Sequence, residues 1–362
     1  MAARGEGQTS PNPTVGAVIE RDGEVVGRGF HTWAGLKHAE VVALEEAKER
    51  ARGATMYVSL EPCSHHGRTG PCVDAILAAG IKKVVAPVQD PNPKVAGRGF
   101  TRLRDAGVEV ELDVSLAGRA KDLNEAFFHF MRTGRPLVML KAAVTLDGKI
   151  AAPDDGTPGF TPGWITSETA RAHVQTLRHK FDAMLTGIGT VLADNCLLTD
   201  RTGEPRSRPL LRIVLDSQLR LPVDSRLVAS AKDDVLVVTT SAGSPERRKK
   251  LEGAGVRVET LERRDGRASL QGVIELLSRE QYLSLMIEAG SRVNWSALES
   301  GVADKIFFYY APKIMGGMHS LPVAGGVGMR QRKDALQFRD VRLHSIAADE
   351  FAVEAWLAHR AN

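Results

Sequence analysis

The first half of the chain is organised around residues 38–72, which read HAEVVALEEAKERARGATMYVSLEPCSHHGRTGPC. This stretch supplies one imidazole, from His38, and two thiols, from Cys63 and Cys72. One imidazole and two thiolates suit a tetrahedral zinc ion whose fourth position stays open for water, as in catalytic zinc sites. Glu40 lies two residues beyond the histidine, near the metal without having to bind it. We therefore predict a catalytic zinc site.

The order of these residues also predicts a reaction. Zinc lowers the pKa of water, and a nearby carboxylate can move the water's proton to a leaving amine. A His-x-Glu motif followed by Pro-Cys and a later Cys is the signature of the zinc nucleobase deaminases. The sequence therefore indicates a deaminase centre in which Glu40 acts as acid and base.

Two other roles are open to the cysteines. The chain has three, so two could be neighbours by chance as small buried hydrophobic residues. A disulfide would leave Cys196 unpaired, and nothing in the sequence indicates an oxidising compartment. His65 and His66 are rival ligands by type, but we expect them to belong to a pocket loop. The zinc interpretation is favoured because both ligand motifs occur in order across a strand-like segment.

Length and composition restrict the class of protein. A chain of 362 residues is long for one hydrophobic core, so two domains are expected. The net charge of +4 is mild, and with few aromatic residues it does not indicate a nucleic-acid surface. The sequence has no apolar run near 18 residues and no signal-peptide core, so neither a membrane span nor secretion is predicted. We expect a cytoplasmic protein.

The first half alternates strands and helices. Asp22-Gly23 predicts a hairpin turn between strands at 15–19 and 24–29. Further strands are predicted at 56–60, 82–88 and 108–112, and helices at 39–50, 72–79 and 101–106. This alternation predicts an α/β sheet covered by helices. We place the domain boundary at residues 132–136, where Pro136 stops a phenylalanine-rich helical stretch.

The second half has its own alternation. Strands are predicted at 137–143, 183–185, 211–215, 235–239, 284–287 and 305–310, and helices at 167–178, 245–252, 270–279 and 295–300. Two turns that follow strands, at 187–191 and 288–291, could hold phosphate on bare backbone amides, although each could equally be a tight turn. The dinucleotide fingerprint is not matched, because Leu192 occupies the third glycine position.

Several ordered motifs carry a resemblance to a known family. They read SPNPTVG (10–16), HAE (38–40), EPCSHHGRT (61–69), DPNP (90–93), TLDG (145–148), WIT (164–166), TVLAD (190–194) and APK (311–313). Together they closely resemble the bifunctional deaminase–reductases of riboflavin biosynthesis. The resemblance covers nearly the whole chain.

The resemblance implies two reactions on one polypeptide. Residues 1–134 would form a cytidine-deaminase-like three-layer α/β/α domain that binds Zn²⁺ and deaminates a phosphoribosylated diaminopyrimidinone. Residues 136–362 would form a dihydrofolate-reductase-like α/β domain that reduces the ribosyl unit to ribityl with NADPH. A homo-oligomer, either a dimer or a tetramer, is expected. A rival interpretation is a deaminase whose second domain is non-catalytic or altered in specificity, because that half has no equally diagnostic residue.

The resemblance also implies ligand contacts. Asn12 would read a base edge through its amide, the alternative being a turn asparagine. Residues near the cofactor would be Ala143, Trp164, Thr166, Thr190 and Asp194, with Gly290 and Ser291 at the pyrophosphate. Residues on the substrate side would be Arg178, Leu198, Arg201 and Glu288. Guanidinium forks suit a phosphorylated substrate, although Arg178 could instead lie on a solvated helix face. From their chemistry we predict that Ser217 and Arg220 hold the 2′-phosphate of NADPH.

Some positions depart from the family pattern. Gly5 lies almost directly before the SPNP motif, so the usual first helix of the deaminase domain has no residues to form it. Gly70 and Ala289 replace a usual proline and a usual glycine. The loop 153–163 is longer than usual, with Pro162 where a polar residue often contacts ligand. We therefore expect the reductase site to differ from the family in its fine geometry.

Overall fold

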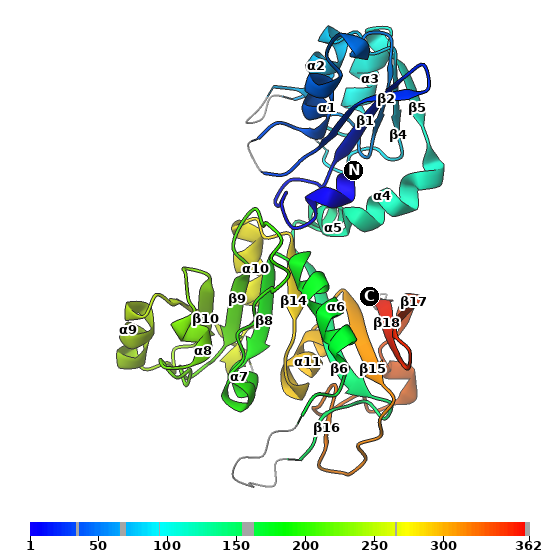
Figure 1. Ribbon diagram of the computed structural model, residues 1–362. Helices are drawn as coiled ribbons and strands as arrows, with labels where there is room; N and C mark the ends of the chain where they lie inside the picture. Colours follow the sequence, from blue (N-terminus) through cyan, green and yellow to red (C-terminus); the bar gives the residue numbers. More distant parts are fainter. Residues whose placement is uncertain (34–35, 66–69, 94, 154–162, 265, 359–362) are drawn as a thin grey trace. The chain divides into compact units, whose positions relative to one another are not determined.

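The computed structural model describes residues 1–33, 36–65, 70–93, 95–153, 163–264 and 266–358, and it divides into two compact units (Figure 1). Unit 1 comprises Met1–Arg135 together with Glu204–Arg208, and unit 2 comprises Pro136–Gly203 and Pro209–Asn362. A short segment from the second half of the sequence therefore packs as part of unit 1.

Unit 1 is built on a five-stranded sheet in the order β2-β1-β3-β4-β5. Its strands are β1 (Gly16–Arg21), β2 (Glu24–Phe30), β3 (Thr55–Val58), β4 (Lys83–Ala86) and β5 (Glu109–Leu112). Strand β1 pairs antiparallel with β2 and β3, whereas β3, β4 and β5 are parallel. The predicted hairpin turn is confirmed: Asp22 and Gly23 have φ values of 54° and 82°, as a two-residue hairpin of this hand requires.

The helices of unit 1 cover this sheet. They are α1 (Ala39–Ala47), α2 (Cys72–Ala78), α3 (Arg98–Asp105), α4 (Ala117–Leu123) and α5 (Glu125–Thr133), with 3₁₀ turns η1 (Ala2–Gly5), η2 (Lys48–Ala51) and η3 (Val114–Leu116). The core contains Ile19, Met56, Ile76 and Leu103, all fully buried. A single 3₁₀ turn, η1, therefore precedes the SPNP motif.

Two glycines of β2 set the position of α1. A Cβ added to Gly27 would lie 2.2 Å from the carbonyl oxygen of Ala43, and one added to Gly29 would lie 2.1 Å from that of Ala39. No larger residue fits at either position without moving the helix. Because α1 is held this close to the sheet, the side chains at its start lie deep in the unit.

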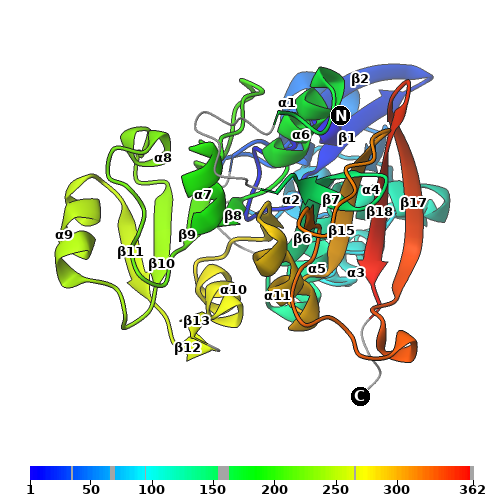
Figure 2. The ribbon, with the colours of Figure 1, turned by 90° about the horizontal axis from the view of Figure 1, so that it is seen from below.

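Unit 2 is built on a nine-stranded sheet in the order β11-β10-β9-β8-β14-β6-β15-β18-β17 (Figure 2). Its strands are β6 (Leu137–Thr145), β8 (Ala183–Gly187), β9 (Leu211–Leu215), β10 (Val235–Thr239), β11 (Arg257–Thr260), β14 (Ser284–Ile287), β15 (Lys305–Ala311), β17 (Phe338–Ala347) and β18 (Glu350–Leu357). The strands from β11 to β15 in this order are parallel, and the β17–β18 hairpin adds antiparallel strands at one edge.

Smaller elements and helices complete unit 2. The helices are α6 (Glu168–His179), α7 (Ile188–Asp194), α8 (Arg226–Ala229), α9 (Pro245–Gly253), α10 (Leu270–Arg279), α11 (Ser291–Glu299) and the 3₁₀ turn η4 (Arg332–Asp334). The short strands are β7 (Lys149–Ala151) with β16 (Leu321–Pro322), and β12 (Arg263–Arg264) with β13 (Arg267–Ala268). The helix predicted at 295–300 begins earlier, at Ser291, directly after the turn that was expected to hold phosphate.

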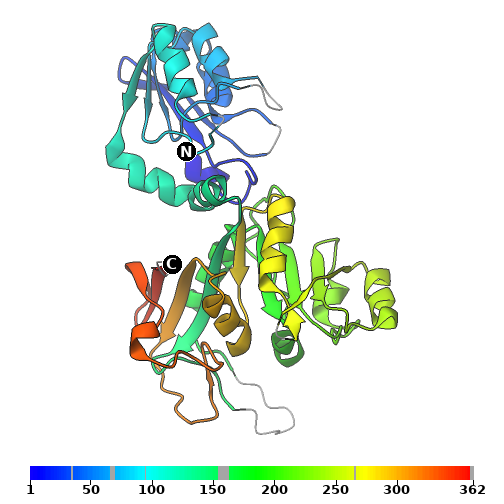
Figure 3. The same ribbon diagram turned by 180° about the vertical axis from the view of Figure 1, so that it is seen from behind.

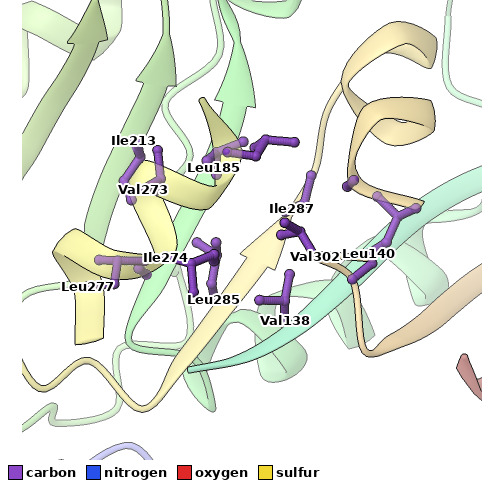
Figure 4. Close-up of a cluster of buried hydrophobic side chains, with 14 of the residues drawn as sticks. Val138, Leu140, Leu185, Ile213, Val273, Ile274, Leu277, Leu285, Ile287 and Val302 are labelled. Carbon is purple, nitrogen blue, oxygen red and sulfur yellow. The ribbon is translucent and has the colours of Figure 1, made fainter. Parts of the chain in front are cut away.

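Alternate residues of the central strands enter two cores. In β6, Val138 and Leu140 pack on one face with α10 and α11, while Met139 packs on the other with α6. Figure 3 shows α10 and α11 against the same face of the sheet, and Figure 4 shows Ile274 and Leu277 of α10 in that core. Because both faces are covered, these strands read as nearly continuous apolar runs, interrupted by single polar residues such as Lys141 in β6.

Candidate metal centre and cofactor cleft

The structure brings the three predicted metal ligands together in unit 1. His38 Nδ1 lies 3.1 Å from Cys72 Sγ and 3.5 Å from Cys63 Sγ, and the three ligand atoms lie within 4.8 Å of one another. A tetrahedral zinc with bonds of about 2.0 Å to nitrogen and 2.3 Å to sulfur separates its ligand atoms by about 3.5–3.8 Å. The residues present therefore fit a zinc ion with one further position for water.

Helix starts place two of these ligands. His38 is the residue before α1, and Cys72 is the first residue of α2, with its backbone N–H 3.3 Å from Cys63 Sγ. The Cys72 thiol donates a hydrogen bond to Cys63. This bond stabilises the Cys63 thiolate and so lowers the pKa of Cys63, and it holds the proton of Cys72 and so raises the pKa of Cys72. Zinc binds cysteine as the thiolate, so binding of the metal would release the thiol proton that makes this hydrogen bond.

Glu40 lies in the first turn of α1 and is only 3% exposed. Burial raises the pKa of its carboxyl group to about 7, and the negative charge of Cys63 adds to this effect. A zinc cation beside it would act in the opposite direction. A buried carboxyl group at this place can hold or release a proton near neutral pH.

Glu61 fastens the loop that carries Cys63. Its carboxylate accepts hydrogen bonds from the backbone N–H groups of Asp90 (3.2 Å), Gly97 (2.9 Å), Gly99 (2.9 Å) and Phe100 (3.2 Å). A Cβ added to Gly99 would lie 2.0 Å from the carbonyl oxygen of Pro62, so the loop and the start of α3 touch backbone to backbone. The Glu-Pro-Cys motif therefore combines a metal ligand with the carboxylate that positions it.

Asn12 contacts a histidine that the sequence analysis did not single out. His31 Nδ1 lies 3.2 Å from the carbonyl oxygen of Lys37, which can only accept, so this nitrogen donates. His31 Nε2 therefore accepts from the amide nitrogen of Asn12, 3.0 Å away, and burial lowers the pKa of the ring. The His31 ring lies 5.2 Å from the ring of His38, edge to face. Asn12 is thus held beside the metal centre, and a lone buried histidine offered no spacing that could have predicted this.

The rival histidines are not part of this group. His65 is exposed, and the ligand cluster of the described residues does not include it. His66 lies outside the described residues.

Unit 2 contains a cavity of about 2480 Å³ that includes residues at the carboxyl ends of β6, β8, β9 and β14. Its lining contains every residue predicted to contact cofactor or substrate in the second half: Ala143, Trp164, Thr166, Arg178, Thr190, Asp194, Leu198, Arg201, Ser217, Arg220, Glu288, Gly290 and Ser291. Pro162 lies outside the described residues. The carboxyl edge of a parallel sheet is where α/β proteins bind ligands.

A buried ion cluster lies in this cavity. Arg178 donates to both oxygens of Glu288, with Nε at 2.8 Å and Nη2 at 2.9 Å, and Lys141 Nζ lies 3.2 Å from Oε2. Burial alone would raise the pKa of Glu288, but the two cations lower it to about 2. Burial lowers the pKa of Lys141, only partly offset by Glu288. Arg178 is 13% exposed, which excludes the alternative of a solvated helix face.

The helix α11 begins at the predicted pyrophosphate turn. Gly290 precedes its first residue, and Ser291 Oγ is buried without a hydrogen-bond partner among the described residues. A Cβ added to Gly325 would lie 2.4 Å from this hydroxyl, so that glycine keeps the approach open. Bare amides at a helix start, joined by a hydroxyl able to donate, suit an anionic ligand.

Ser217 and Arg220 lie on one turn after β9. The buried carboxylate of Asp216 accepts from the backbone N–H of Leu221 at 2.7 Å, which closes this turn. Ser217 Oγ accepts from the backbone N–H of Ala268 at 3.1 Å, and Arg220 is exposed. The turn therefore presents a hydroxyl and a guanidinium group together.

No helix in the described ranges is long and apolar enough to cross a membrane.

Comparisons with known proteins cover both units. The family described as cytidine and deoxycytidylate deaminase zinc-binding region matches residues 1–88, and the RibD C-terminal domain matches residues 136–350. The riboflavin biosynthesis protein RibD of Actinobacillus pleuropneumoniae is 44% identical over 339 residues, 94% of this chain and 88% of that protein. The protein of the same name from Escherichia coli K12 is 40% identical over 366 residues, 96% of this chain and 95% of that protein.

Solved structures agree with these matches. Acinetobacter baumannii RibD aligns with a TM-score of 0.85 at 35% identity, covering 99% of this chain and 96% of that chain. A diaminohydroxyphosphoribosylaminopyrimidine deaminase/5-amino-6-(5-phosphoribosylamino)uracil reductase from Thermotoga maritima aligns with a TM-score of 0.79 at 34% identity, covering 99% and 95%.

Proposed function

This chain belongs to the RibD family of bifunctional riboflavin-biosynthesis enzymes, and from that premise we propose how its residues divide the two reactions. The chain is a zinc-dependent pyrimidine deaminase and an NADPH-dependent reductase. We assign deamination to residues 1–134 and reduction to residues 136–362. The observation that carries the assignment is the grouping of His38, Cys63 and Cys72 within 4.8 Å, in the half of the chain that matches the deaminase family.

In the first reaction the substrate is 2,5-diamino-6-(5-phosphoribosylamino)pyrimidin-4-one. His38, Cys63 and Cys72 would hold a zinc ion, which supplies activated water at neutral pH. Glu40 would accept a proton from the water and deliver it to the exocyclic amino group of the pyrimidine, which leaves as ammonia. Asn12, whose NH₂ group is engaged by His31, presents its amide oxygen to the base edge.

In the second reaction a bound NADPH would provide the hydride that reduces C1′ of the ribosyl unit, and the ring oxygen would gain a proton as the ring opens. We assign that proton to Lys141, which is buried in the cavity beside Glu288 and has a lowered pKa. Arg178 holds Glu288 in place through its hydrogen bonds. Arg201 lines the same cavity, is exposed and does not take part in the Arg178–Glu288 pair, so its guanidinium group suits the substrate phosphate. Ser291 and the first amides of α11 would bind the cofactor pyrophosphate.

Assembly and location follow as further parts of the proposal. We propose a homo-oligomer, a dimer or a tetramer, because the edge strand β17 exposes Val341 (60%) and Leu343 (73%), and long exposed edges with apolar residues are usually covered. We propose a cytoplasmic location, because Cys63, Cys72 and Cys196 are free thiols that suit a reducing compartment.

Substitution of Glu40 by glutamine tests the division of labour. Glu40→Gln keeps the shape of the side chain but removes proton transfer, so deamination should fall by roughly a hundredfold or more. The zinc content and the oxidation of NADPH with the deaminated intermediate should be unchanged, whereas Asp194→Ala should impair reduction alone. Loss of both activities in a folded, zinc-loaded Glu40→Gln enzyme would show that the two reactions share one centre.

A further inference from the structure

Unit 1 contains a segment, Glu204–Arg208, that the sequence places well inside the second half of the chain. The backbone N–H of Ser207 donates to the carbonyl oxygen of Gly7 at 3.1 Å. Arg208 Nη2 donates to Ser10 Oγ at 3.2 Å. The segment is therefore hydrogen-bonded to the N-terminal residues that lead directly into Asn12.

The turn that Arg208 contacts leads to the metal centre. The backbone N–H of Asn12 donates to the carbonyl oxygen of Thr9 at 2.8 Å and closes a turn around Ser10. The Asn12 side chain then donates to His31 at 3.0 Å, and the His31 ring lies 5.2 Å from the ring of His38. A shift of Ser10 would therefore change where the amide of Asn12 lies relative to the metal ligands.

We propose that Arg208 is a positioning residue for deamination. Its guanidinium group holds Ser10. Because Ser10 lies within the turn from Thr9 to Asn12, this contact also fixes the position of Asn12, whose side chain binds the base. The planar fork of arginine loses less freedom per hydrogen bond than a lysine chain, which suits it to fixing a partner. A residue of the second half of the chain thus contributes to the first reaction. The inference rests on the deaminase centre proposed above.

The experiment uses the full-length, zinc-loaded enzyme. Arg208→Ala should lower kcat/KM for deamination about tenfold, since displacement of a binding group by a fraction of an ångström is enough for such a loss. The loss should appear in KM rather than kcat, because Asn12 binds the base and carries no proton. Ser10→Ala should give a similar loss, and the double variant should be no worse than Arg208→Ala. Arg208→Lys should recover most of the activity, because its ammonium group can still donate to Ser10.

Controls separate this role from general damage. Arg50→Ala removes an exposed arginine of the same unit and should leave deamination unchanged. Zinc content and NADPH oxidation with the deaminated intermediate should be unchanged in Arg208→Ala. The proposal is overturned if Arg208→Ala deaminates like Arg50→Ala, if its loss multiplies with that of Ser10→Ala, or if zinc content and reduction fall with it. Undiminished deamination by Glu40→Gln would instead refute the centre itself.

Discussion

Replacing Glu61 by glutamine should loosen the metal centre without touching a metal ligand. One carboxylate oxygen accepts from the N–H groups of Asp90 and Gly97, and the other from those of Gly99 and Phe100. Glutamine turns one of these oxygens into an NH₂ group that faces two backbone donors. Each buried donor left without an acceptor costs about 1–3 kcal/mol, so the expected destabilisation is roughly 2–6 kcal/mol.

Amide hydrogen exchange measures this effect where it arises. The amides of residues 90–100 in Glu61→Gln should exchange at least about thirtyfold faster than in the wild type, which corresponds to the lower bound of about 2 kcal/mol. The zinc content should fall with the loss of order in the Cys63 loop. Glu49→Gln, on the exposed 3₁₀ turn η2, is the matched control and should leave both quantities unchanged. If these amides exchange in Glu61→Gln at the same rate as in the wild type, the carboxylate does not position the loop.

Three further outcomes are expected. Cys63→Ala and Cys72→Ala should each reduce the metal content well below one zinc per chain, and full zinc occupancy by metal analysis would remove the site assignment. Arg220→Ala should weaken the binding of NADPH far more than that of NADH in titrations, because only NADPH carries a 2′-phosphate; equal losses would place that contact elsewhere. Lys141 must be protonated to donate, and its pKa lies below the ordinary value of 10.5, so reduction should fall as pH rises through that lowered pKa. The pH profile of NADPH oxidation checks this, and a Lys141→Met variant that keeps both the activity and the alkaline limb would contradict it.

The buried strands were the most predictable part of the fold. The ranges predicted for β9, β10 and β14 agree with the structure residue for residue, because a parallel strand covered on both faces is a nearly continuous apolar run. The predicted fold classes are confirmed by the relatives and by the aligned structures of the RibD family. Local periodicity and chemical motifs were sufficient for these conclusions.

Elements without a buried face were missed. Strand β17 has no fully buried residue, so its sequence shows no apolar alternation, and its pairing depends on β18. Contacts between residues far apart in the sequence could not be predicted either. Arg178 and Glu288 were each predicted to face the substrate, but no spacing rule could predict that they pair with each other across 110 positions of sequence. The packing of Glu204–Arg208 with unit 1 belongs to the same class of long-range contact.

The strand order of unit 2 has a consequence for how the protein is made. Strand β6 is the first strand of the unit to leave the ribosome, yet its neighbours in the sheet are β14 and β15, which begin at Ser284 and Lys305. Leu137–Thr145 therefore lacks its neighbouring strands, and its apolar side chains stay uncovered, until most of the remaining chain has been translated. Such late pairing slows folding and leaves an aggregation-prone intermediate during synthesis. Stalled or truncated products that end before Ser284 should need chaperones to stay dispersed, whereas residues 1–135 can begin to form their own sheet while translation continues.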